Sequence, residues 1–229
     1  MFRGRRSSSP SSERDEDLGS EAYSGVGRGT LVLADISGYT AFLQAVGAAH
    51  AADMAAGTFV PKAYPLLTSL LDGIVERMAP PFVLSKVEGD AVFAFSPEGE
   101  LGLRGQSVVD CLNACYEAYR ARLDEVSELM VCTCDACLSI GSLELKFVLH
   151  HGEYIVQLVA GHRELFGPDV TISHLLTKNH VAELMGRSAY ALITEPAATH
   201  LDIPLERARP IIEQYEHYAP VRACVLPLP

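Results

Sequence analysis

The hydrophobic pattern changes period several times along the chain, which predicts a domain of mixed helices and strands. The apolar run 30–36 stops at Ser37-Gly38, as a buried strand that ends in a turn does. The stretch 41–78 is rich in Ala and Leu at helical spacing but is interrupted at Gly57 and Pro61, which predicts two helices or one broken helix. Further strands are predicted at 82–87, 91–95, 143–150, 154–160 and 190–194 and within 215–226, and further helices at 106–129 and 170–183.

The predicted order is strand, helices, strand, strand, helix, strand, which is the split βαββαβ order of ferredoxin-like sheets. Turn residues predict one hairpin around 88–90 and a second around 151–153. A helical crossover makes the first two strands parallel, and the hairpin partner at 91–95 fits between them, antiparallel to both. We therefore expect an α+β fold, a ferredoxin-like sheet with helices on one face, in which the first strand ends beside the start of the third.

Composition and charge narrow the class of protein. The chain has 229 residues and a formal net charge of −11, which argues against a nucleic-acid partner because phosphate backbones are bound mainly by Lys and Arg. No apolar run approaches the roughly 18 residues of a membrane span, so no membrane partner is expected. Residues 1–29 mix Ser with alternating charge, so we expect a disordered tail before one domain at 30–229. No apolar segment follows the first basic residues, which predicts a cytoplasmic protein with reduced thiols.

Two carboxylates are expected to meet at one end of the predicted sheet. Asp35 lies at the end of the first strand and Asp90 at the start of the third, on strands about 4.8 Å apart. Paired carboxylates suit Mg²⁺, which is usually held by one or two of them plus substrate phosphates. The turn at Ser37-Gly38 would let a triphosphate approach backbone N–H groups. The alternative is that Asp35 caps the following helix and that Asp90 is an ordinary turn residue.

Three segments resemble motifs of class III adenylate and guanylate cyclases, in the order that the family has them. Residues 35–43 (DISGYTAFL) resemble the D-I-x-G-[FY]-T segment, residues 86–95 (KVEGDAVFAF) the K-x-x-G-D hairpin, and residues 166–174 (FGPDVTISH) the G-[DN]-x-V-N-x-A-x-R segment. The chain also resembles an uncharacterised bacterial branch of that fold, domain of unknown function 2652, through a C-x-C-x-A-C loop and an L-K-F-x-x-H-x-G strand. Together the cyclase motifs cover roughly residues 30–195.

The resemblance implies a nucleotide site and a symmetric homodimer. It assigns Asp35 and Asp90 to two divalent cations, Mg²⁺ or Mn²⁺, which in a cyclase activate the ribose hydroxyl and clamp the triphosphate. It assigns Lys86, with Glu164 three residues before Gly167, to recognition of the base, because such a pair offers one donor and one acceptor to a purine edge. The expected ligand is a purine nucleoside triphosphate.

Two positions depart from the cyclase pattern. Thr171 stands where cyclases have the Asn that orients the ribose, and Leu175 stands where they have the Arg that stabilises charge on the transferring phosphate. Such an Arg accelerates phosphoryl transfer by a factor on the order of 10³ to 10⁵. Thr171 would keep a hydroxyl in place, and Lys178, one helical turn past Leu175, would bring a cation to the same face without the bidentate fork of Arg.

The expected function is therefore that of a nucleotide- and metal-binding cyclase-homology protein, catalytically impaired, with a signalling or regulatory role. One alternative is an active adenylate-type cyclase that converts ATP to cyclic AMP and pyrophosphate, with Thr171 and Lys178 as its catalytic residues. A second alternative is a zinc- or redox-sensing module in which the nucleotide site is vestigial.

The loop predicted at 131–140 carries three thiols within six residues, Cys132, Cys134 and Cys137. Structural Zn²⁺ takes four ligands, most often Cys, so this loop is a candidate zinc site. The candidates for the fourth ligand are Cys111, Cys115, His150 and His151. The alternatives are three reduced thiols packed in a loop and a redox switch.

Overall fold

The computed structural model describes residues 25–57, 59–186 and 188–229. Most of the predicted tail, residues 1–24, lies outside the described residues. Residues 25–29 are not part of a tail: the first strand begins at Gly25, because residues 25–29 pair with the far half of a long neighbouring strand. The predicted start of the domain at residue 30 is therefore wrong.

The strands are β1 (Gly25–Ser37), β2 (Val83–Glu88), β3 (Ala91–Pro97), β4 (Glu144–Val159), β5 (His162–Phe166), β6 (Tyr190–Thr194), β7 (Arg209–Glu213) and β8 (Val221–Pro227). The helices are α1 (Tyr39–Ala49), α2 (Ala51–Ala55), α3 (Ala63–Met78), α4 (Gln106–Glu128), α5 (Asp135–Leu138), α6 (Pro168–Leu175), α7 (Val181–Met185) and α8 (Glu195–Leu201), with 3₁₀ turns η2 (Ser139–Ser142) and η3 (Leu176–Lys178).

One sheet runs through the whole domain. Its strand order is β2-β3-β1-β4-β6-β8-β7, and β5 pairs with the outer half of β4. β3 lies between β1 and β2 and is antiparallel to both, so the predicted arrangement of the first three strands is confirmed. The end of β1 consequently lies beside the start of β3, which is the relation that the predicted carboxylate pair requires.

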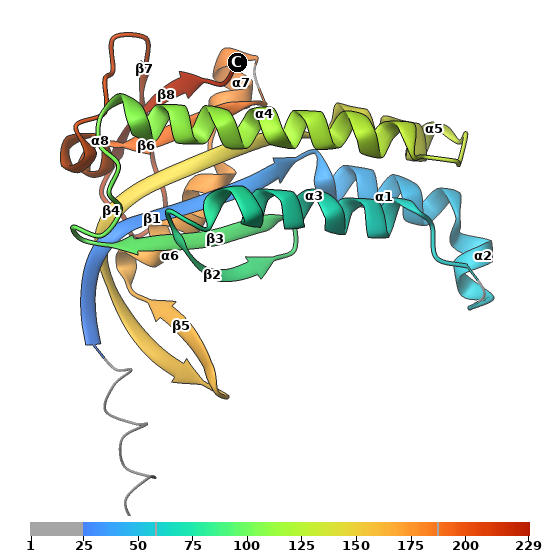
Figure 1. Ribbon diagram of the computed structural model, residues 1–229, viewed down its shortest axis with the longest axis horizontal. Coiled ribbons are helices and arrows are strands. Elements are labelled where there is room, and N and C mark those ends of the chain that lie inside the picture. Colours follow the sequence, from blue (N-terminus) through green and yellow to red (C-terminus); the bar gives the residue numbers. More distant parts are fainter. Residues whose placement is uncertain (1–24, 58, 187) are drawn as a thin grey trace, which may run out of the picture.

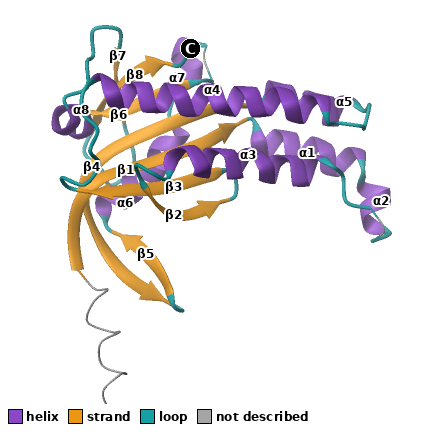
Figure 2. Cartoon of the chain, in the orientation of Figure 1, coloured by secondary structure: helices purple, strands orange, loops and turns teal. Residues whose placement is uncertain are grey.

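Helices cover the sheet unequally. The long helices α3 and α4 lie side by side across one face, and α1 and α8 belong to the same layer (Figure 1, Figure 2). The prediction of helices on one face holds for these; the short α6 and α7 pack on the opposite face. β1 is buried on both faces, with Leu31 and Leu33 toward α6 and Val32 and Ala34 toward α3 and α4, which explains why residues 31–34 are all apolar.

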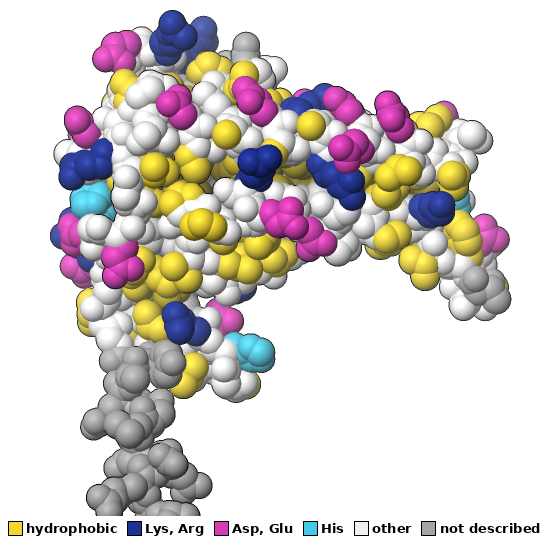
Figure 3. Space-filling view, in the orientation of Figure 1, with side chains coloured by type: hydrophobic (Ala, Val, Ile, Leu, Met, Phe, Trp, Pro, Cys, Tyr) yellow, Lys and Arg dark blue, Asp and Glu magenta, His cyan; other side chains and the backbone are white. Residues whose placement is uncertain are grey.

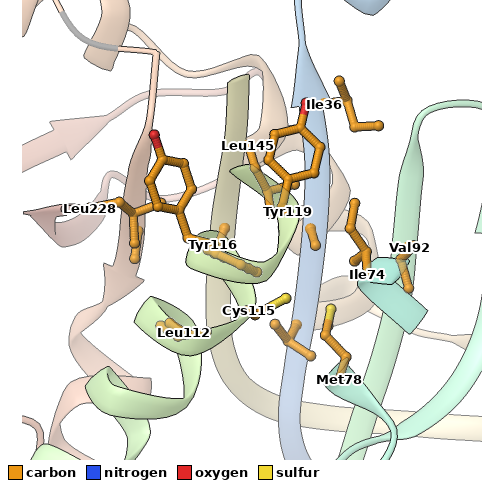
Figure 4. Close-up of a cluster of buried hydrophobic side chains, with 14 of the residues drawn as sticks. Ile36, Ile74, Met78, Val92, Leu112, Cys115, Tyr116, Tyr119, Leu145 and Leu228 are labelled. Carbon is orange, nitrogen blue, oxygen red and sulfur yellow. The ribbon is translucent and has the colours of Figure 1, made fainter. Parts of the chain in front are cut away.

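The larger of the two cores lies between the sheet and the α3–α4 pair. Figure 4 shows Ile74 and Met78 from α3 and Cys115 from α4 in one cluster with Val92 of β3, to which Leu112 of α4 also belongs. Cys115 is buried within this apolar cluster. Its thiol therefore packs in the core.

The hairpin turn predicted at 151–153 is wrong. β4 passes through these residues unbroken, with Gly152 opposite Gly29 of β1. The chain reverses instead at Ala160-Gly161, where both residues have positive φ (51° and 82°), and returns as β5, which was not predicted. Gly152 is not a turn residue. It lets the side chain of Asp169 approach β4 closely, in the place that a Cβ would occupy.

Other differences concern short elements. The region 41–78 forms α1, α2 and α3, and the helix predicted at 170–183 is divided into α6, η3 and α7. Toward the C-terminus the structure has α8 and β7, which were not predicted, before the terminal strand β8. Among the described residues, no helix combines the length and the apolar character needed to cross a membrane.

Candidate functional site

The two predicted carboxylates lie at the same edge of the sheet. Asp35, near the end of β1, is adjacent to Ala91 of β3 in the ladder, and the N–H of Ile36 donates to the carbonyl of Asp90 at 3.1 Å. Gly89, with a φ of 62°, gives the β2–β3 turn the conformation that leads the chain into Asp90. The local geometry of one hairpin and one strand end thus brings Asp35 and Asp90 together.

Both carboxylates line a cavity of about 670 Å³ between the end of β1, the β2–β3 hairpin and the α6–η3 segment. The first turn of α1 forms another wall, and Gly38, with a φ of 89°, turns the chain from β1 into this helix. Residues 38–41 of this turn line the cavity, and the first turn of α1 contains no acidic residue. Backbone N–H groups at a helix N-terminus favour anions such as phosphates.

Lys146, which was not predicted as a site residue, neutralises Asp35. Its Nζ lies 3.1 Å from Oδ1 of Asp35, and each side chain is only 15% exposed. The ammonium also donates to the carbonyl of Thr177 at 2.9 Å, which ties β4 to the η3 turn. Burial raises the pKa of Asp35, Lys146 opposes this rise, and the charge of Asp90 adds to it. The sequence signal that could have identified Lys146 is its position in a strand predicted to be buried, because a buried charge needs a partner.

The predicted base-recognition pair is in contact. Nζ of Lys86 lies 2.9 Å from Oε2 of Glu164, across the gap between β2 and β5, and 2.6 Å from Oε1 of Glu88. Burial lowers the pKa of Lys86, but the hydrogen bonds to Glu88 and Glu164 outweigh it and the net shift is upward. Glu88 also lines the cavity and faces Nδ1 of His174 at 3.3 Å. The pair therefore lies beside the cavity and is joined to its wall through Glu88.

The remaining predicted residues also stand on the cavity wall. Thr171, Leu175 and Lys178 line it from α6 and η3. The hydroxyl of Thr171 donates to the carbonyl of Gly167 at 3.1 Å, and Lys178 is exposed. Ser37 lines the opposite wall and donates to the carbonyl of Ser188 at 3.3 Å.

The three thiols of the 131–140 loop gather around a residue that was not among the candidates for a fourth ligand. His50, which follows α1, points its ring nitrogen Nε2 at Cys132, Cys134 and Cys137. The backbone N–H of Cys137 lowers the pKa of the Cys134 thiol to about 7.

The four candidates named from the sequence lie elsewhere. His150 hydrogen-bonds Thr194 at 2.9 Å and Asp169 at 3.3 Å, and the ring of His151 stacks on that of His200. Cys111 and Cys115 are on α4, where Cys115 packs in the core. None of these four candidates belongs to the cluster. His50 was missed because no sequence periodicity relates it to a loop more than eighty residues away.

The strands and helices around this cavity have the arrangement of nucleotidyl cyclase domains. The adenylyl cyclase CyaB from P. aeruginosa superposes with a TM-score of 0.61 and 13% sequence identity, over 89% of this chain and 95% of that chain. The guanylyl cyclase Cya2 gives a TM-score of 0.61 and 13% identity, over 89% of this chain and 93% of that chain. The class III cyclase fold predicted from the motifs is confirmed.

The chain belongs to the family described as "Protein of unknown function (DUF2652)", whose model matches residues 67–184. It is 30% identical over 151 residues to the uncharacterized protein Rv2561/Rv2562 of Mycobacterium tuberculosis. The aligned region covers 66% of this chain and 68% of that protein. The resemblance to this branch, drawn from the thiol loop and the β4 motif, is thus confirmed, and the roles of individual residues stay predictions.

Proposed function

We propose that the protein binds a purine nucleoside triphosphate with a divalent cation, Mg²⁺ or Mn²⁺, in the Asp35–Asp90 cavity. The juxtaposition of these two carboxylates with the first turn of α1 carries the proposal. Carboxylate oxygens are the ligands that Mg²⁺ prefers, and one oxygen of Asp35 stays available because Lys146 contacts Oδ1. The donor set therefore fits a divalent cation, which would supply charge neutralisation for the phosphates.

The charge of the cavity explains why the cation is required. The described residues that line it include three carboxylates, Asp35, Glu88 and Asp90, and two ammonium groups, Lys146 and Lys178. A triphosphate brings several further negative charges into this acidic surrounding. Its binding is therefore expected to depend on the metal, with the N–H groups of α1 and the turn at Ser37 and Gly38 holding the phosphates.

The residues that line this cavity favour the hypothesis that catalysis is impaired. A nucleotide-binding protein of this kind would have a signalling or regulatory role. Leu175 presents an apolar side chain to it, and the cavity-lining cations among the described residues are lysines only. Lysine lacks the planar fork with which arginine holds a phosphate in two hydrogen bonds. Thr171 offers a hydroxyl toward the ribose, but its proton is directed to Gly167.

A homodimer fits the distribution of exposed apolar side chains. Val83, Leu84 and Val87 of β2 are each at least 39% exposed, and Leu158, Val159 and Phe166 of the β4–β5 hairpin at least 44%. Figure 1 shows this hairpin projecting away from the helical layer. We propose that these surfaces meet a second copy of the chain, with the Lys86–Glu164 pair near the junction.

Metal-dependent nucleotide affinity tests the proposal. Titration calorimetry with non-hydrolysable ATP and GTP analogues should detect binding in Mn²⁺ and none in EDTA. Asp90→Asn should weaken binding at least about 100-fold, because the change removes a metal ligand and not merely a supporting partner. Asp124→Asn, which alters an exposed acid on α4, is the matched control. Equal affinities for wild type and Asp90→Asn would refute the proposed site.

The position of Lys178 on the cavity wall favours one second candidate, an active adenylate-type cyclase with a lysine in place of arginine. If it operates, Lys178→Ala should abolish formation of cyclic AMP and pyrophosphate while nucleotide binding falls far less. Lys62→Ala, at an exposed lysine outside the cavity, is the control. Cyclic AMP production by wild type that is unchanged in Lys178→Ala would contradict the assigned role.

A further inference from the structure

Four potential metal ligands from two distant parts of the chain converge at one end of the molecule. His50 directly follows α1, Cys132 and Cys134 lie in the segment after α4, and Cys137 is in α5. Figure 1 shows α5 and the α1–α2 junction at the same end of the domain, away from the β4–β5 hairpin, and α1 and α5 are in contact. This cluster is separate from the nucleotide cavity, none of whose lining residues belongs to it.

The distances from His50 to the three thiols, and between two of the thiols, are close to those of a tetrahedral coordination sphere. Nε2 of His50 lies 3.3 Å from Sγ of Cys137, 3.5 Å from that of Cys134 and 3.6 Å from that of Cys132. Tetrahedral Zn²⁺, with Zn–S of about 2.3 Å and Zn–N of about 2.0–2.1 Å, places sulfur and nitrogen about 3.6 Å apart and two sulfurs about 3.8 Å apart. The Sγ atoms of Cys132 and Cys134 are 3.4 Å apart, too far for a disulfide bond and close to the tetrahedral edge.

The surroundings also favour a metal over simple packing of thiols. The ligand atoms of all four residues lie within 4.8 Å of one another, so their polar ends face a common centre. The backbone N–H of Cys137 donates to Sγ of Cys134 at 3.4 Å, a hydrogen bond that stabilises the thiolate form that binds metal. The Phe59 ring lies 5.8 Å from the His50 ring and shields one side of it, and Cys137 is buried.

We propose that His50, Cys132, Cys134 and Cys137 form a structural Zn²⁺ site. Three thiolates and one imidazole fill the four positions that zinc takes in structural sites, which leaves no position for a substrate. The ion would join the C-terminal end of α1 to the segment between α4 and β4. These parts are 82 residues apart in sequence, so the site closes the long segment that contains α2, α3 and α4.

Elemental analysis of the protein purified without chelator tests the site. Wild type should contain one zinc per chain, and His50→Ala and Cys132→Ser should lose it. His50→Cys should retain zinc, because it restores a fourth ligand that zinc accepts. Cys111→Ser is the matched control, since this thiol is on α4 outside the cluster.

A second measurement uses only the wild type, so it stays valid if the variants fail to fold. Replacement of the bound metal by Co²⁺ should give the visible absorption of a tetrahedral cobalt thiolate. Asp90→Asn should keep its zinc, so failure of the nucleotide proposal leaves this result unaffected. Wild type with no bound zinc or cobalt, or with a disulfide among the three cysteines, would overturn the proposal. Full zinc content in His50→Ala would overturn the ligand assignment.

Discussion

Adding a methyl group at Gly29 is expected to lower the free energy of unfolding by about 3 kcal/mol, the upper end of the usual cost of overpacking. Gly29 lies in the centre of the sheet, paired with Pro97 of β3 and with Gly152 of β4. A Cβ at this position would collide with the carbonyl oxygen of Ser96 and would lie 3.0 Å from the Cα of Pro97. These are backbone atoms, which cannot rotate away as a side chain can, so β1 and β3 would have to separate.

Thermal and urea unfolding of Gly29→Ala measure this effect. For a domain of this size a loss of 3 kcal/mol corresponds to a fall in Tm of roughly 6–12 °C. Gly25→Ala is the control on the same strand, because no atom lies within 4 Å of its added Cβ, and it should stay within about 0.5 kcal/mol of wild type. Equal unfolding midpoints for the two variants would show that the β1–β3 spacing is not fixed by Gly29.

Replacing Lys146 by methionine is expected to cost about 3 kcal/mol of stability at neutral pH in the absence of divalent cations. The substitution keeps the length of the side chain but leaves the buried carboxylate of Asp35 without its ion-pair partner and close to Asp90. Added Mg²⁺ should restore part of the loss, since the cation replaces the missing positive charge. Lys178→Met, at an exposed lysine of the same cavity, should change stability by no more than about 0.5 kcal/mol.

The loss in Lys146→Met should shrink on acidification. Burial raises the pKa of Asp35 above its ordinary value of 3.8, Lys146 opposes the rise, and Asp90 adds to it. Without Lys146 the pKa rises further. A carboxyl with a raised pKa holds its proton more tightly in the folded protein, so the variant regains stability as the pH falls through that pKa. Unfolding at about pH 7.5 and about pH 4.5 measures this, and a loss independent of pH would contradict it.

A double variant separates the ion pair from general damage to the site. Lys146→Met combined with Asp35→Asn removes both charges, and its stability should exceed that of Lys146→Met alone. If the two substitutions simply add, the two side chains do not interact energetically.

The arrangement of the first three strands and the meeting of Asp35 and Asp90 followed from the sequence, because both depend on patterns within residues 30–95. Apolar runs, a glycine turn and a helical crossover determine how the first three strands pair. The Lys86–Glu164 contact was expected from the family resemblance alone. Its two residues are brought together by β5, a strand that was not predicted.

The incorrect or missed predictions concern residues whose contacts lie on a distant part of the chain. The glycine at position 152 was interpreted as a turn residue. In the structure a glycine is needed there because the side chain of Asp169, on α6, approaches β4 closely. Lys146 and His50 likewise have partners on other elements, Asp35 in one case and the thiol loop in the other. A charge in a strand predicted to be buried, such as Lys146, indicates that a partner exists, but a single sequence does not identify which distant residue that partner is.

Helix α1 runs from the middle of the domain to the end where α2 and α5 lie (Figure 1). Its first turn lines the Asp35–Asp90 cavity, and its last residue is followed by His50 in the thiol cluster, about 16 Å away along the helix axis. Figure 3 shows hydrophobic side chains reaching the surface at the end where α2 and α5 lie. A chelator such as the EDTA of the binding test would also remove zinc from the proposed cluster, so the metal content and thiol state of a sample belong beside every nucleotide affinity measured on it.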